Sequence, residues 1–480
     1  METMKEGITF SDVLLVPKRS TIASRKSVDT SGSFSRNIKL KCPIVSANMD
    51  TVTEADMAIA MAQAGGLGII HRFLTIEEEA AQVAKVKRTE SVLIEEPYTI
   101  SPRDTVGAAR DFMRSKQVGG LLVVGEGRKL LGVVSERDLQ FHDDDSAPVK
   151  AVMSSKLVTA RPGITLEAAA KVLARHKIEK LPIIDASGTL KGLITAKDIK
   201  KKRLHPEASE DPKGRLLVGA AVGVVGDFME RSAALLSAGA DVLVVDVAHG
   251  HSDHVIEAVA RIKKRWPAAE LVAGNVATYE GARDLTEAGA DGIKVGVGPG
   301  SICSTRIVSG AGVPQLTAIL DCAKLTAKSG VPVISDGGVR DPGDITKAMA
   351  AGASSVMIGS LLAGTEESPG LMIVRGGIKY KLYRGMASLT ATLSRRITES
   401  GGHHRVDDEE AMEVVAEGVE SMVPFRGRAF EVVHQLAGGL RSGMSYSGAR
   451  TVAELWRKAE FIRITPAAWA ESLPRLERKS

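Results

Sequence analysis

The stretch GIKVGVGPGSICSTR spans residues 292–306 and joins a short apolar run to a loop with glycines at alternate positions. Short apolar runs rich in β-branched side chains are typical of parallel strands that are buried on both faces. Seven further runs of this kind occur along the chain, at residues 43–48, 67–71, 216–221, 241–246, 271–275, 331–335 and 354–358.

Alanine-rich amphipathic segments separate most of these runs, at residues 227–239, 252–265, 279–289, 315–329 and 342–351. Eight strands that alternate with helices give the count of a closed (β/α)8 TIM barrel, an α/β fold. In such a barrel the active site lies at the carboxyl ends of the strands. The strand count alone leaves an open, doubly wound sheet as the alternative.

The composition limits the classes of function. The chain has 480 residues, enough for two or three domains. A net charge of +5 and 4% aromatic residues do not indicate a nucleic-acid-binding protein. No apolar run has membrane-spanning length, and residues 1–10 contain no signal-peptide core. Three cysteines form no disulfide framework. We therefore expect a cytoplasmic protein with no membrane or nucleic-acid partner, in which a free thiol can react.

An internal repeat interrupts the alternation of strands and helices. Residues 99–138 align with residues 159–198 at a shift of 60 positions. A repeat this regular indicates two packed copies of one supersecondary unit. We expect the barrel to comprise residues 1–91 and 204–480, with the pair inserted at 92–203 as copies 92–150 and 151–203.

Each copy ends in the motif Gly-x-x-Ser/Thr-x-x-Asp, which makes the pair similar to tandem CBS domains. The resemblance implies that the hydroxyl and carboxylate side chains bind the ribose of a regulatory purine nucleotide such as ATP or GTP. A carboxylate suits that role because it accepts hydrogen bonds from two vicinal hydroxyls. The alternative is that the aspartates cap the following helices. The residues concerned are Ser135, Asp138, Thr195 and Asp198.

The loop at residues 296–306 carries the strongest chemical signal. Its glycines let backbone groups approach a ligand, and Ser301 with nearby N–H groups suits a phosphate. Cys303 lies in a polar turn where exposure is expected, and a neighbouring cation such as Arg306 would favour its thiolate. A buried, inert thiol is the alternative, and it fits Cys42 and Cys322 better.

This loop resembles that of the IMP dehydrogenase/GMP reductase family, and the resemblance covers nearly the whole chain. Supporting motifs occupy residues 8–17, 46–54, 335–338, 357–360, 383–386 and 438–443. The family commonly inserts a CBS pair into its barrel at this point. Membership implies that Cys303 attacks the purine C2 of a bound nucleotide monophosphate, IMP or GMP.

The resemblance also implies roles for residues at matching positions. Asp336 would accept the ribose hydroxyls, Gly385 and Met386 would meet the base, and Glu417 would read the purine edge. The 5′-phosphate would be held by Ser301, Gly338, Gly359, Ser360 and Tyr383. Ala387 departs from the glycine that is usual in the family.

Further implications concern cations and assembly. Backbone carbonyls of Gly298, Gly300 and Cys303 match positions that bind a monovalent cation, which makes a potassium site an expectation. Such sites form against a neighbouring subunit, and we expect a homotetramer or homo-octamer.

Two reactions share a covalent Cys303 intermediate in this family. A dehydrogenase converts IMP, NAD and water to XMP and NADH, whereas a reductase converts GMP and NADPH to IMP and ammonia. Dehydrogenases carry an Arg-Tyr pair in a mobile flap, here at about residues 387–422. Arg405-Val406 matches that pair in an uncertain register, and no tyrosine lies between Arg384 and Ser445. Valine has no hydroxyl with which to orient a water.

The segment at residues 246–252 also resembles reductases. We expect Asp246, His249 and Asn275 to meet the nicotinamide cofactor, and we interpret His251 as loop surface. Thr305 and Glu417 match a relay that protonates departing ammonia, although dehydrogenases have it too. The sequence therefore favours an NADPH-dependent GMP reductase. The alternatives are an NAD-dependent IMP dehydrogenase and a non-catalytic nucleotide sensor, which would not need Cys303. Residues 423–427 resemble a dehydrogenase as much as a reductase, and the inserted CBS pair is commoner among dehydrogenases.

Overall fold

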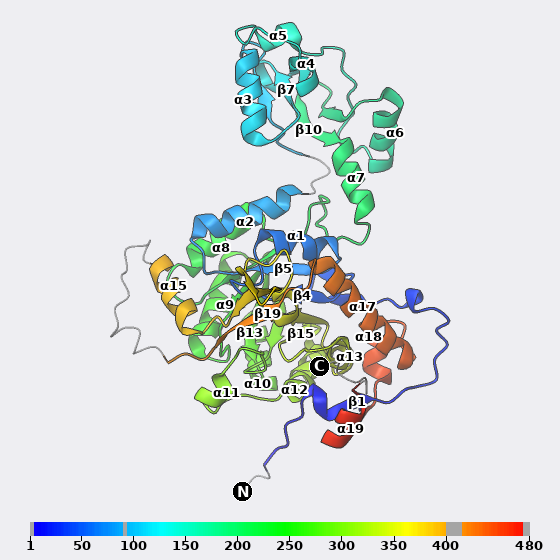
Figure 1. The fold of residues 1–480 in the computed structure, drawn as a ribbon, viewed down its shortest axis with the longest axis vertical. Coiled ribbons are helices and arrows are strands. Elements are labelled where there is room, and N and C mark those ends of the chain that lie inside the picture. The colour runs from blue at the N-terminus through cyan, green and yellow to red at the C-terminus, as the bar shows by residue number, and fades with distance from the viewer. Residues whose placement is uncertain (1–3, 90–93, 400–414, 474–480) are drawn as a thin grey trace. The chain divides into compact units, whose positions relative to one another are not determined.

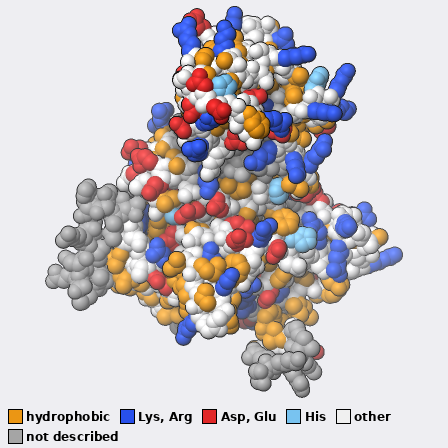
Figure 2. Space-filling model, turned by 45° about the horizontal axis from the view of Figure 1, so that its top comes forward, with side chains coloured by type: hydrophobic (Ala, Val, Ile, Leu, Met, Phe, Trp, Pro, Cys, Tyr) orange, Lys and Arg blue, Asp and Glu red, His pale blue; other side chains and the backbone are white. Residues whose placement is uncertain are grey.

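The computed structural model describes residues 4–89, 94–399 and 415–473, except for a few side chains (Figure 1). The chain divides into two compact units, which are described separately below. One comprises residues 1–89, 207–211 and 216–480, and the other comprises residues 90–206 and 212–215. None of the described helices is both long and apolar enough to cross a membrane. Acidic and basic side chains are interspersed on the face shown in Figure 2.

The first unit is a closed barrel of eight parallel strands, as the sequence predicts. Val356 pairs with Ile44, which closes the sheet and excludes the open, doubly wound alternative. Each predicted apolar run overlaps one of the strands. In barrel order they are β4 (Ile44–Ser46), β5 (Leu67–Ile70), β11 (Gly219–Val222), β12 (Val242–Asp246), β13 (Glu270–Val276), β14 (Gly292–Val295), β15 (Val333–Asp336) and β16 (Ser355–Ile358).

Amphipathic helices cover the outside of the barrel. Helix α9 is representative, because Val255, Ala258, Val259 and Ile262 recur at helical spacing and are all buried. The covering helices are α1 (Ala55–Gln63), α2 (Ile76–Thr89), α8 (Phe228–Ala238), α9 (Asp253–Arg265), α10 (Tyr279–Glu287), α12 (Gln315–Ser329), α13 (Pro342–Ala350) and α17 (Ala429–Tyr446).

Side chains alternate along each strand between the barrel interior and the helix layer. In β12, Val242 and Val244 belong to the interior cluster, whereas Leu243 and Val245 pack in the outer cluster. The next inward position is Asp246, and the same alternation brings Lys294 of β14 and Asp336 of β15 inward. Polar residues therefore occupy the last inward positions of these strands, at their carboxyl ends.

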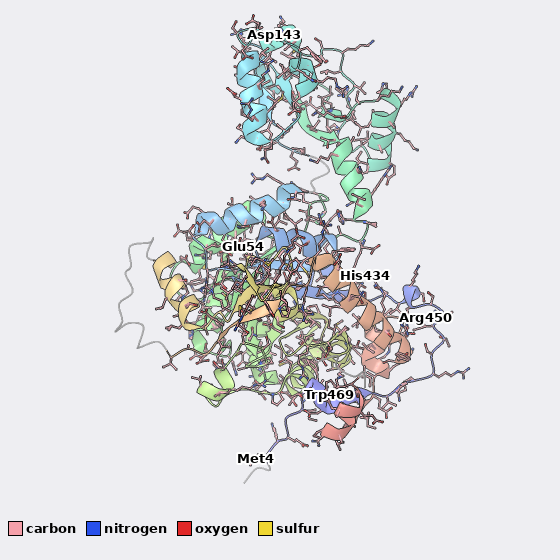
Figure 3. All side chains as sticks on the ribbon, in the orientation of Figure 1. Met4, Glu54, Asp143, His434, Arg450 and Trp469 are labelled. Atoms are coloured by element: carbon pink, nitrogen blue, oxygen red, sulfur yellow. The ribbon has the colours of Figure 1, made fainter. Side chains whose placement is uncertain are left out.

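Additional segments complete this unit. A small antiparallel sheet consists of β17 (Met372–Arg375), β18 (Ile378–Arg384) and β19 (Glu420–Pro424), and α15 (Leu389–Glu399) lies within the predicted flap. Strand β1 (Val13–Leu15) pairs with β20 (Phe461–Arg463). The ring of Trp469 on α19 (Pro466–Glu471; Figure 3) lies 5.8 Å from the Arg340 guanidinium and 5.4 Å from Lys347 Nζ. These cation–π contacts fix the C-terminal helix to the barrel.

The second unit repeats its elements at the predicted spacing of 60 residues. Thr105 and Thr165 accept hydrogen bonds from Ala108 and Ala168 at the starts of corresponding helices. The first copy contains β6 (Thr99–Ile100), α3 (Val106–Lys116), β7 (Gly120–Val124) and β8 (Leu130–Ser135). The second contains α6 (Leu166–His176), β9 (Lys180–Ile184), β10 (Leu190–Thr195) and α7 (Ala196–Leu204). Each copy has its own apolar core, as expected of tandem CBS domains.

The first predicted nucleotide motif forms a helix cap. The Ser135 hydroxyl and N–H donate to Asp138 Oδ2 at 2.7 and 2.8 Å, and Asp138 N–H donates to Ser135 Oγ at 3.4 Å. Asp138 therefore caps α4 (Glu136–Leu139), as the alternative interpretation holds, and nucleotide binding stays a prediction. The Asp198 side chain lies outside the description.

Candidate functional site

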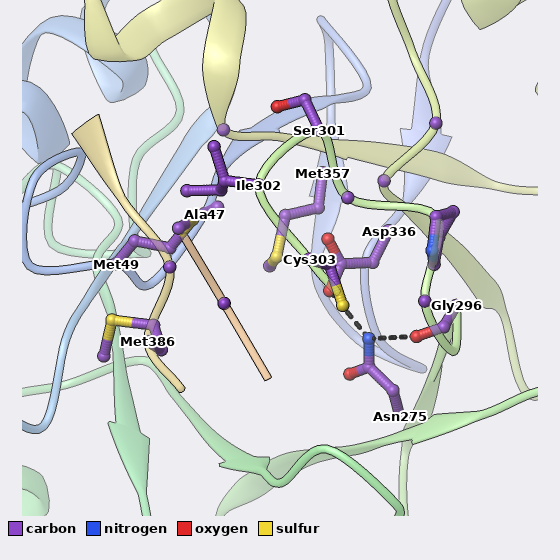
Figure 4. Close-up of a pocket in the computed structure, with 18 of the residues that line it drawn as sticks. Ala47, Met49, Asn275, Gly296, Ser301, Ile302, Cys303, Asp336, Met357 and Met386 are labelled. Carbon is purple, nitrogen blue, oxygen red and sulfur yellow. Dashed lines mark hydrogen bonds between the residues drawn. The ribbon is translucent and has the colours of Figure 1, made fainter. Parts of the chain in front are cut away.

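A pocket of about 560 Å³ opens at the carboxyl ends of the barrel strands (Figure 4). Its walls come from the carboxyl ends of seven of the eight strands and the segments after them. Residues 9–11, Gln315, residues 383–387, Arg395 and residues 417–418 complete the lining. The predicted site residues that line it are Asp246, Asn275, Gly298, Gly300, Ser301, Cys303, Thr305, Asp336, Gly338, Gly359, Ser360, Tyr383, Gly385, Met386 and Glu417.

The remaining predicted site residues that the structure describes do not line this pocket. His249 is exposed and lies outside the lining, with its ring 6.5 Å from that of His251. His251 Nε2 contacts Asp284 Oδ2 at 2.9 Å, so this histidine is tied to the neighbouring helix. Arg405 lies outside the described residues. Ser135, Asp138, Thr195 and Asp198 belong to the second unit.

Cys303 lies in the loop that follows β14 and is exposed. The loop turns tightly, with Gly298 at a φ of +80°, where a side chain would clash with Arg306. Cys303 N–H donates to the Gly300 carbonyl at 3.1 Å, and its Sγ lies 3.2 Å from Thr305 Oγ1. Cys42 and Cys322 are buried, and burial raises the pKa of the Cys42 thiol to about 12. An accessible thiol beside a hydroxyl suits Cys303 to nucleophilic attack.

Arg306 holds the cysteine loop together. Its guanidinium donates to the Val297 carbonyl at 3.3 Å and to the Val313 carbonyl at 2.5 Å. These contacts give Arg306 a structural role in the loop. Its charge also interacts with Cys303, and the expected stabilisation of the thiolate stays a prediction.

Backbone hydrogen bonds attach the end of the flap to the cysteine loop. Ser304 N–H donates to the Glu417 carbonyl at 2.9 Å, and Val419 N–H donates to the Ile302 carbonyl at 3.0 Å. Glu417 N–H in turn donates to the Ala387 carbonyl at 3.0 Å. Glu417, distant from Cys303 in sequence, is therefore fixed beside it.

Tyr383 and Gly359 lie next to each other in the pocket wall. Tyr383 is buried, and burial raises the pKa of its phenol to about 12 although a hydrogen bond with Ser301 opposes the shift. The side chain is therefore a neutral hydrogen-bonding group near neutral pH. A Cβ atom on Gly359 would lie 2.8 Å from Tyr383 Oη and 3.2 Å from Met49 Sδ. Only glycine leaves this corner open to a ligand.

A buried ionic network forms the floor of the pocket. Lys294 Nζ lies 2.5 Å from Asp246 Oδ1 and 2.6 Å from Asp336 Oδ2, and the lysine side chain is only 3% exposed. Burial opposes both charged forms. Even so, Lys294 holds the pKa of Asp246 below its usual range, and the two carboxylates raise the pKa of Lys294. Lys294 and Asp246 are thus ionised together.

Two asparagines complete the network. Asn48 Nδ2 donates to Asp246 Oδ2 at 2.8 Å. Asn275 Nδ2 donates to Asp336 Oδ2 at 2.9 Å and to the Gly296 carbonyl at 2.8 Å (Figure 4). The sequence analysis missed Lys294 and Asn48. A lysine within an apolar strand was the available signal for the first, whereas nothing local distinguishes the second.

Several other lining residues were not predicted. Met49 and Met357 join Met386 around the space beside Cys303. The Phe73 ring lies 5.4 Å from the Arg72 guanidinium and 5.9 Å from that of Arg395. The described residues contain no cluster of three His, Cys, Asp or Glu side chains that suits a metal ion. Potassium binding by backbone carbonyls stays a prediction.

Comparisons with known proteins agree with this geometry. The family description "IMP dehydrogenase / GMP reductase domain" matches residues 7–475. Inosine-5′-monophosphate dehydrogenase of Nitrosopumilus maritimus is 56% identical, with 98% of each chain covered. That of Bacillus subtilis is 50% identical, over 98% of this chain and 96% of the relative. The solved GMP reductase C318A of Trypanosoma brucei, in complex with guanosine 5′-monophosphate, aligns with a TM-score of 0.89 at 46% identity, covering 98% of each chain.

These relatives correct one prediction. The assignment as a GMP reductase is wrong, because full-length curated relatives at 50 to 56% identity are IMP dehydrogenases. The assignment relied on the missing flap tyrosine and on the reductase-like segment at residues 246–252. Thr305 Oγ1, 3.2 Å from Cys303 Sγ, shows that a hydroxyl is present beside the nucleophile without a tyrosine.

The match extends over both units and over the pocket. The barrel, the repeated insertion, the exposed Cys303 and the glycine corner at Gly359 all lie within the matched residues. The chain therefore belongs to the IMP dehydrogenase/GMP reductase family of oxidoreductases, which act with a nicotinamide cofactor in purine metabolism.

Proposed function

We propose that the chain is an IMP dehydrogenase that converts IMP, NAD and water to XMP, NADH and a proton. The observation that carries this proposal is the full-length identity of 56% to a curated IMP dehydrogenase. The exposed Cys303 thiol at the carboxyl ends of the barrel strands supplies the nucleophile that the reaction needs.

The pocket offers a separate group for each part of IMP. Ser301, Gly338, Gly359, Ser360 and Tyr383 hold the 5′-phosphate, since small residues and hydroxyl groups leave space for its oxygens. Asp336 accepts the ribose hydroxyls. Gly385, Met386 and Glu417 meet the purine, with Glu417 fixed by its backbone beside the cysteine loop.

The part of the pocket beside Asp246 fits a nicotinamide nucleoside. The Asp246 side chain is 25% exposed and is held ionised by Lys294, so it can accept hydrogen bonds from a second ribose. Asn275 lines the same wall. When bound, the nicotinamide ring accepts the hydride that leaves purine C2.

Cys303 divides the reaction into two steps. Its thiolate adds to C2 of IMP, and departure of the C2 hydrogen as hydride leaves the purine joined to sulfur. Water then attacks C2, the C–S bond breaks, and XMP leaves with Cys303 regenerated as a thiolate. The chain's residues hold C2 against sulfur in the first step and orient water in the second.

We infer that Thr305 and Glu417 activate that water. Thr305 Oγ1 lies 3.2 Å from Cys303 Sγ, and residue 417 is bonded through its backbone to Ser304. A hydroxyl can pass a proton from water to a carboxylate, so this pair supplies the general base. Arg405 remains a candidate partner in the flap.

Activity assays test the reaction. Incubation of the protein with IMP and NAD should produce NADH and XMP in equal amounts, and Cys303→Ala should lower turnover by at least about a thousandfold because no covalent step remains. IMP binding should survive in this variant, since the phosphate and ribose groups are untouched. Cys42→Ala, which changes a buried thiol, is the control. Oxidation of NADPH by GMP without NADH formation from IMP would refute the proposal.

Gly359→Ala tests the phosphate corner. The added methyl group would meet Tyr383 Oη and Met49 Sδ, so we expect KM for IMP to rise about tenfold with little change in kcat. The control is Gly438→Ala, because a Cβ at that position on α17 meets no atom within 4 Å. Equal KM values for the two variants, measured by initial rates, would remove Gly359 from the phosphate site.

The CBS pair should bind ATP or GTP and change the activity or the assembly size of the protein. Asp138→Asn combined with Asp198→Asn should abolish the response to nucleotide. The amide side chain still caps a helix, but it has a single acceptor oxygen and cannot accept from two ribose hydroxyls as a carboxylate does. Asp144→Asn, which alters another carboxylate of the same unit that accepts from a backbone N–H, is the control. Rates and light scattering that neither nucleotide changes in the parent protein would contradict nucleotide regulation.

A further inference from the structure

Lys294 occupies an inward position of β14 that an apolar residue would otherwise fill. Its neighbours Ile293 and Val295 pack in the outer cluster, whereas Lys294 is buried at the top of the barrel interior. A buried ammonium group is costly unless it is paired. The network described above pairs it twice, with Asp246 and with Asp336.

These two aspartates come from strands that are not neighbours. Asp246 ends β12 and Asp336 ends β15, with β13 and β14 between them. Both carboxylate oxygens lie within 2.6 Å of one nitrogen, and hence no more than roughly 5 Å from each other. Two carboxylates this close repel each other unless a cation lies between them.

We propose that Lys294 is a positioning residue that sets the separation of Asp246 and Asp336, and thereby places the substrate ribose and the cofactor ribose relative to each other. This inference rests on the proposed function, which gives Asp336 the ribose of IMP and Asp246 the ribose of the nicotinamide nucleoside. It adds a role for a residue that contacts neither reacting atom.

The consequence for catalysis follows from geometry. Hydride transfer needs its two carbon atoms close together and aligned, and an error of about 1 Å can slow such a step about a hundredfold. Each ribose is anchored by one of the two aspartates. A change in the spacing of the aspartates is therefore passed to the reacting carbons, although each ligand keeps its other contacts.

A second buried lysine, Lys87 of α2, offers a matched control near the opposite end of β12. Lys87 is also buried, at 4% exposure, and its Nζ lies 3.2 Å from Asp211 Oδ2 and 2.6 Å from Asp241 Oδ2. Asp241 directly precedes β12, whereas Asp246 ends it. Loss of either lysine removes the cation from between two carboxylates, but only Lys294 adjoins the pocket.

The test compares Lys294→Met, Lys294→Arg and Lys87→Met with the parent protein. Stopped-flow absorbance measures NADH formed in the first turnover at saturating IMP and NAD. Protection of Cys303 from alkylation measures the Kd of IMP. We expect Lys294→Met to lower the first-turnover rate about a hundredfold and to raise the Kd of IMP about fivefold. Lys294→Arg should recover part of the rate, since it restores the charge in a wider, planar group. Lys87→Met should lower Tm but leave both measurements within about twofold.

A first-turnover rate in Lys294→Met within tenfold of the parent would overturn the proposal, and so would an equal loss in Lys87→Met. If Lys294→Met does not fold, Lys294→Arg provides the test. A first turnover roughly tenfold slower than in the parent protein, at unchanged Tm, supports the proposal. A first-turnover rate within twofold of the parent overturns it. A parent protein that forms no NADH from IMP would overturn the proposed function alone. In that case the Kd of IMP for Lys294→Met tests the role of Lys294, and a Kd equal to that of the parent protein would refute the role.

Discussion

Closure of the barrel between β16 and β4 is the constraint on which the site depends. Because all eight strands are parallel, closure brings their carboxyl ends to one rim, and inward side chains there can meet across the interior. Val242 and Val244 fill the interior of β12, and Asp246 follows at the next inward position. The apolar interior below therefore ends in a polar layer that can face a ligand.

The chemistry of that rim comes from pairing residues distant in sequence. The cysteine loop follows β14, yet Ser304 and Ile302 form backbone hydrogen bonds with residues 417 and 419. Tyr383, near the end of β18, lies against Gly359 after β16. Neither arrangement is covalent or local, so the site exists only when the barrel and the small sheet are folded together.

Hydrophobic patterning predicted the fold well, because a strand buried on both faces has a recognisable run of apolar residues. The repeat was equally visible, and Thr105 and Thr165 cap corresponding helices. The cysteine loop and its glycines were identified from local chemistry. The predicted reaction was wrong because it inferred an activity from a missing flap tyrosine and from a reductase-like segment at residues 246–252, whereas identity over the whole chain points to IMP dehydrogenases. Lys294 was missed because its partners, Asp246 and Asp336, are distant in sequence and meet it only when the barrel is folded.

The central claim is that Cys303 forms a bond to purine C2 at the rim of the barrel. Acid quenching during turnover of IMP with NAD, followed by digestion and mass spectrometry, tests it most directly. The account predicts that the peptide containing Cys303 carries the mass of an oxidised purine nucleotide, and that the peptides containing Cys42 and Cys322 remain unmodified. NADH formation with an unmodified Cys303 peptide at every quench time would contradict the account.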